Sequence, residues 1–177
     1  MSNFDRTSPS LRDIIDNDAA DPMEMSGRTP ERLVGYGFRC WLTGFETGDV
    51  TAWEDAWNSY RASLGADAAK PLILQLSQFV RAVSANADRS IEVYPPRCSG
   101  FCRDECLAIS IIAACQHGQR TALCTCAAAL LGSNDIGDAL ICAQNFAAGL
   151  KAADRMLCQS SVCAANCPLW AARPRVQ

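Results

Sequence analysis

The sequence lacks the features of membrane-spanning and secreted proteins. None of its 177 residues fall in an uninterrupted apolar run of membrane-spanning length. Residues 1–28 contain no basic segment followed by an apolar one, which is the pattern of a secretory signal. We therefore expect no membrane association and a cytoplasmic location. A reducing compartment keeps thiols free and disfavours a framework of disulfides.

Signals for nucleic-acid binding and for common catalytic sites are also missing. The net charge is -3, and lysine and arginine are interspersed with acidic residues rather than gathered in a stripe, so we predict no nucleic-acid binding. The chain has no phosphate-binding glycine loop and a single histidine, His117, which we interpret as a residue at a helix end beside Gly118. We predict that the protein is not an enzyme.

Alternation of apolar and polar residues, the pattern of a half-buried β-strand, does not recur, whereas helical periodicity does. We expect three helices before residue 90, which begin at Pro30 after a Thr29 cap, near Thr51, and near Pro71. Three more follow, at about 101–117, at about 121–131, and from 133 or 134 towards 157. The sequence therefore predicts an all-α fold, a helical bundle of six or seven helices.

Composition divides the chain into four segments. Residues 1–28 are polar, and we predict a mobile arm there. Residues 29–89 form a helical part that is rich in aromatic residues and contains one cysteine, Cys40. The adjacent prolines of residues 90–97 predict an extended connector. Residues 98–170 form a helical part with the other ten cysteines, and we expect it to share one compact domain with residues 29–89, since 49% hydrophobic content suffices for an ordinary core.

Eight of the ten cysteines of the second part fall into three groups. In RCSGFCRDEC, residues 97–106, three cysteines recur at intervals of about one helical turn, so in a helix they would share one side. A C-x-C pair follows in LCTC, and C-x4-C-x3-C-P closes the second part. Thiolates are soft ligands that suit Cu(I), Zn(II) or iron-sulfur clusters. We predict a soft-metal site among Cys98, Cys102, Cys106, Cys124, Cys126, Cys158, Cys163 and Cys167.

The repeated C-x3-C steps on successive helices resemble the cytosolic four-helix copper storage proteins, whose bundle interior is lined with cysteines that hold many Cu(I) ions. The matching residues are Cys98, Cys102, Cys106, Cys163 and Cys167. The resemblance covers the second part only, because the first part has no counterpart in that family. It implies Cu(I) binding more than it implies storage.

Two other functions stay open. An iron-sulfur or thiol redox regulatory module would use the same cysteines, although C-x2-C, the spacing of ordinary zinc ribbons and thioredoxin-like pairs, occurs nowhere. Alternatively, the chain is a helical interaction domain in which the cysteines only pack, as we expect for Cys40, Cys115 and Cys142 among their apolar neighbours. Metal identity, a protein partner and self-association are not fixed by the sequence.

Two further expectations concern the charged residues around the first cysteine group. We expect the adjacent carboxylates Asp104 and Glu105 to lie on a solvated face. We also expect Arg97 and Arg103 to lower the pKa of nearby thiols.

Overall fold

The computed structural model of the chain describes residues 29–162, and within that range it consists of helices without any strand. The helices are α3 (Pro30–Thr47), α4 (Val50–Leu64), α5 (Ala66–Asn86), α6 (Arg103–Gln116), α7 (Arg120–Leu131), α8 (Gly137–Ala152) and the short 3-10 turn η1 (Gln159–Ser161). The predicted all-α fold is confirmed. The predicted arm at 1–28, and the predicted ligands Cys163 and Cys167, lie outside the described residues. No helix in the described range is long and apolar enough to cross a membrane.

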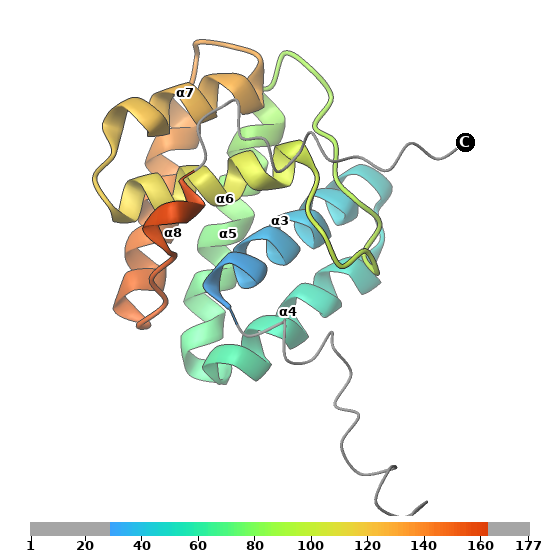
Figure 1. Cartoon of the computed structure of the whole chain (residues 1–177). Helices are drawn as coiled ribbons and strands as arrows, with labels where there is room; N and C mark the ends of the chain where they lie inside the picture. The colour runs from blue at the N-terminus through green and yellow to red at the C-terminus, as the bar shows by residue number, and fades with distance from the viewer. Residues whose placement is uncertain (1–28, 163–177) are drawn as a thin grey trace, which may run out of the picture.

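The helices pack mainly in pairs, α5 with α8, α6 with α7, and α3 with α4 (Figure 1). Their apolar faces meet in one hydrophobic core, to which both parts of the chain contribute. Phe38 and Phe79 come from the first part, and Ile112 and Phe146 from the second, and all four are fully buried. Helix α6 also packs on α3 and α8, so the cysteine-rich part rests directly on the aromatic part.

Helix starts follow local capping chemistry where the sequence provides it. Helix α3 begins at Pro30, and Thr29 Oγ1 accepts a hydrogen bond from the Arg32 amide, as predicted. Helix α4 begins slightly before the predicted position, because Asp49 rather than Thr51 is its N-cap. The predicted start of α5 at Pro71 is wrong. The helix begins at Ala66, directly after Gly65 with its positive φ, and Pro71 lies inside it.

Helix α8 is shorter than predicted at both ends. The chain turns after Gly132, which ends α7 in the left-handed conformation, and α8 starts only at Gly137. At the other end Asp154 has a φ of 57°, and the amides of Asp154 and Arg155 donate to the carbonyls of Lys151 and Leu150. This is the Schellman arrangement that ends a helix. Cys158 therefore lies well beyond the end of this helix.

Residues 87–102, here called the connector, join α5 to α6 without helix or strand. They include the predicted extended segment 90–97 and continue past it on both sides. The amide of Asp88 donates to Leu131 O at 2.9 Å, which joins the beginning of the connector to the end of α7.

Candidate functional site

Asp104 and Glu105 lie in the first turn of α6 and are buried, so the prediction of a solvated acidic face is wrong. Each carboxylate has its own arginine. Arg39 on α3 donates from Nε to Glu105 Oε1 at 2.5 Å and from Nη2 to Oε2 at 3.0 Å. Arg89 donates from Nη2 to Asp104 Oδ1 at 2.6 Å and from Nη1 to Oδ2 at 2.9 Å. Charge-assisted pairs with two bonds each offset the cost of burying these groups.

The same ion pairs hold the connector in place through its main chain. Asp104 accepts from the amide of Glu92 at 2.8 Å, and Glu105 accepts from the amide of Cys102 at 2.7 Å. From the other side, Arg39 donates to the carbonyls of Cys98 at 2.7 Å and Gly100 at 2.6 Å. The connector is therefore fixed by side chains from α3 and α6, although it has no regular secondary structure.

Cys98, Cys102 and Cys106 do not form a row on one helix, because α6 starts only at Arg103. Cys98 lies exposed in the connector, and Cys102 is the N-cap residue of α6. The Cys102 thiol is buried and donates to Glu92 O at 3.0 Å. Burial raises the pKa of Cys102 to about 11, contrary to the lowering we expected from Arg103. Cys106 follows within α6 and is half-buried.

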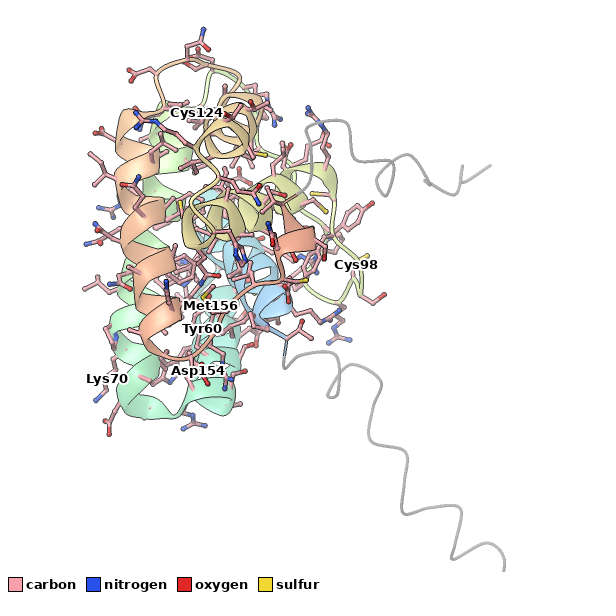
Figure 2. The ribbon with its side chains drawn as sticks, turned by 60° about the vertical axis from the view of Figure 1, so that its left-hand side comes forward. Tyr60, Lys70, Cys98, Cys124, Asp154 and Met156 are labelled. Carbon is pink, nitrogen blue, oxygen red and sulfur yellow. The ribbon has the colours of Figure 1, made fainter. Side chains whose placement is uncertain are left out.

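The C-x-C pair lies within the regular helix α7, where its two side chains point apart. Cys126 is buried in the core, whereas Cys124 is half-buried. Figure 2 shows Cys124 at the top of the molecule on α7, and Cys98 at its right-hand edge in the connector. The structure thus does not bring Cys124 together with Cys126 or with Cys98 around one ion.

Cys158 lies at the start of η1 and is exposed. Its amide donates to Glu31 at 2.6 Å, which joins this segment to the first turn of α3. Its Sγ lies 2.9 Å from the Ser160 hydroxyl, and this hydrogen bond lowers the pKa of Cys158 by stabilising the thiolate.

Between residues 29 and 162, no three side chains of histidine, cysteine, aspartate or glutamate gather in a way that could hold a metal ion. The six predicted ligands in this range are consequently spread over the connector, α6, α7 and the start of η1. Any site with three or more protein ligands would need groups from beyond this range or from a second molecule.

Two cysteines from different helices do line one pocket, here called the α6–α7 pocket. Its volume is about 280 Å³. The pocket is lined by Ala114, Cys115, Gly118, Arg120, Leu123, Cys124, Leu140 and Gln144. Buried Ala114 and Leu123 belong to its interior, the exposed Gly118, Arg120 and Gln144 border it, and the thiols of Cys115 and Cys124 are half-buried. Burial raises the pKa of Cys115 to about 11.

Sequence reasoning missed this pairing, because it assigned Cys115 to packing and paired Cys124 with Cys126. A signal was present in the short connection between α6 and α7. Residues 117–119 alone separate the two helices, so residues near that turn on both sides are neighbours in space. Helical spacing within one helix cannot show such a pair.

A second hollow lies between α5 and α8, with a volume of about 490 Å³. Cys142 is its single cysteine, and Arg81, Asp138 and Ile141 also line it. Ile141 is 58% exposed. No second thiol lines this hollow.

Comparison with known proteins identifies no relative, since no protein-family model, curated protein or solved structure matches the chain.

Proposed function

We propose that the protein binds a soft metal ion, Cu(I), through cysteine thiolates and acts in its storage, buffering or sensing. The observation that carries this proposal is the α6–α7 pocket, where Cys115 and Cys124 from two helices line the same small space. Two thiolates are a sufficient ligand set for Cu(I), which accepts linear coordination and prefers soft sulfur ligands.

The number of thiols favours Cu(I) over the other metals that the sequence suggested. Structural Zn(II) takes four ligands in a tetrahedron, and iron-sulfur clusters are held by four cysteines. The α6–α7 pocket supplies two. A site for Zn(II) or an iron-sulfur cluster would have to recruit Cys163, Cys167 or a second copy of the chain, and we rank both below Cu(I).

The state of the exposed cysteines supports a cytoplasmic protein with accessible thiols. Cys98 and Cys158 are both exposed and form no disulfide with another described residue. These two, together with Cys106, Cys163 and Cys167, are the further ligands that we propose for additional ions. Free thiols suit a reducing compartment.

The test is a Cu(I) titration under anaerobic conditions, with a chromophoric Cu(I) chelator as competitor, on protein prepared without a metal-binding tag. We expect Cys115→Ser and Cys124→Ser each to remove one tightly bound Cu(I) per chain. Cys142→Ser, which alters a half-buried thiol outside the pocket, is the matched control and should bind as the wild type does.

Metal and acid-labile sulfide content of the freshly isolated protein separates the alternatives. Iron with sulfide would favour an iron-sulfur module. Bound zinc that added Cu(I) does not displace would favour a tetrahedral Zn(II) site. A protein that arrives empty and takes up neither Cu(I) nor Zn(II) with sub-micromolar affinity would contradict the proposal. The cysteines would then be packing or redox residues of a helical interaction domain.

A further inference from the structure

The α6–α7 pocket is lined by a positively charged side chain as well as by its two thiols. Arg120 is the first residue of α7 and lines the pocket together with Cys115 and Cys124. Within the described part of the chain, its guanidinium makes no hydrogen bond or ion pair. The pocket lies between the carboxyl end of α6, which holds Cys115, and the amino end of α7, so the two helix dipoles oppose each other there and Arg120 supplies the positive charge.

This arrangement fits an anionic complex better than a bare cation. A Cu(I) ion held by two thiolates has a net charge of -1, which Arg120 would offset at short range. A thiol that approaches as a thiolate also brings negative charge, and the attraction rises where solvent is partly excluded. The positive charge of Arg120 therefore favours Cu(I) bound by the two cysteine thiolates, and it also favours the approach of a third thiolate.

The thiols are also reachable from solvent. Gly118, Arg120 and Gln144 are exposed along the border of the pocket, and neither cysteine is fully buried. Its volume of about 280 Å³ suits a small molecule rather than a protein segment.

We propose that the α6–α7 pocket exchanges Cu(I) with a small thiol that bears carboxylates, and that Arg120 guides and holds that thiol. The inference rests on the proposed function, since it requires Cu(I) on Cys115 and Cys124. The incoming thiolate forms a new copper–sulfur bond, which gives a three-coordinate trithiolate. One bond from copper to a cysteine sulfur then breaks, and the second breaks as another small thiolate arrives. The released cysteines take protons from water, and copper stays Cu(I), so no electron is transferred.

The experiment measures the rate at which copper leaves the loaded full-length protein. The protein carries one Cu(I) per chain and is mixed anaerobically with glutathione, which bears carboxylates, or with 2-mercaptoethanol, which bears none. The two thiols are compared at equal thiolate concentration. A chromophoric chelator at a concentration that does not itself strip the protein reports the copper released.

We expect Arg120→Gln to slow transfer to glutathione about tenfold and to change transfer to 2-mercaptoethanol much less. Added salt should slow the glutathione reaction of the wild type and affect that of Arg120→Gln less, because screening removes the same attraction. Arg120→Lys should recover most of the rate. Arg61→Gln, an exposed arginine on α4, is the control and should behave as the wild type.

The possible failures can be told apart. If Cys115→Ser and Cys124→Ser leave Cu(I) binding unchanged, the pocket is not the site, and both proposals fail. If the copper load depends on both cysteines but Arg120→Gln exchanges with both thiols at wild-type rates, only the exchange proposal is contradicted. Circular dichroism of each variant checks that the fold is retained.

Discussion

At the scale of single residues, the buried pair of Arg39 and Glu105 is the most consequential feature. Their side chains are 1% and 0% exposed, and the guanidinium also donates to three carbonyls of the connector. Removal of one charge would leave the other buried without its partner, which costs far more than the intact pair contributes.

We expect Glu105→Gln to lower the free energy of unfolding by about 3–5 kcal/mol, because Arg39 would lose its counter-charge in the core. Urea denaturation measures this. Glu54→Gln, on the exposed side of α4, makes the same chemical change at the surface and should shift stability by less than about 0.5 kcal/mol. A similar small effect of both substitutions would contradict the role given to the pair.

The buried thiol of Cys40 predicts a loss of stability in alkali. Burial raises its pKa to about 11, whereas a thiol in an unfolded chain ionises near pH 8.5. Between these values the folded state holds more protons, so its stability is complete below about pH 8.5 and falls as pH rises.

Between about pH 8.5 and pH 11 we expect the ionisation of Cys40 to lower the free energy of unfolding by about 2–3 kcal/mol. Urea denaturation at a series of pH values should show a shallower decline for Cys40→Ala than for the wild type. Cys98→Ala removes an exposed thiol and should leave the slope unchanged. Equal slopes for wild type and Cys40→Ala would mean that other groups cause the alkaline loss.

At the scale of helices, close approach of α3 and α4 depends on the absence of a side chain at Gly44. A Cβ atom there would overlap the indole of Trp53, which packs with Trp41 and Phe45. Gly137, at the start of α8, has open space around it. Two glycines in helices thus have opposite tolerance for alanine.

We expect Gly44→Ala to destabilise the protein by about 1–3 kcal/mol, because the indole must move, although alanine favours helix. Gly137→Ala should be neutral or stabilise by up to about 1 kcal/mol. Thermal unfolding followed by circular dichroism compares the two variants. A stabilised Gly44→Ala would mean that the two helices separate without cost.

Helices were predicted more successfully than the contacts between them. The Thr29–Pro30 start and the Gly132 end were read correctly, since both depend on neighbouring residues alone. The start of α6 was placed two residues too early. The cysteine row also needed helix from Cys98 onward, and that segment belongs to the connector. The start of α6 depends on Glu105, whose carboxylate accepts hydrogen bonds from the Cys102 amide and from the side chain of Arg39, 66 residues earlier in the chain. The pairing of Cys115 with Cys124 likewise needs the packing of two helices.

At the scale of the whole molecule, the two parts of the chain share their core. Helix α5 packs against α8, and α3 packs against α6. Arg39 from the first part fixes the connector, and Arg155 from the second donates to Ser63 O at 2.7 Å. Each part alone would expose its half of the apolar surface to water.

We therefore expect neither residues 1–97 nor residues 98–177 to fold alone. Circular dichroism should show a cooperative thermal transition for the intact chain and none for either fragment. Half of the core does not bury enough apolar surface to offset the conformational entropy that a fragment loses on folding. A cooperative transition in the 98–177 fragment would show that the cysteine-rich part is an independent unit.

Between residues 92 and 102 the connector is held largely through main-chain atoms, whereas near its start the Arg89 side chain pairs with Asp104 and at its end the Cys102 thiol bonds to Glu92 O. Arg39, Asp104 and Glu105 recognise the amides and carbonyls of residues 92–102, not the identities of their side chains. Exposed positions such as Ser99 are thus open to replacement over evolutionary time, provided that the number of residues stays the same. An insertion or deletion would displace every downstream amide from its carboxylate. In this segment, the number of residues is therefore more constrained than the identity of the exposed side chains.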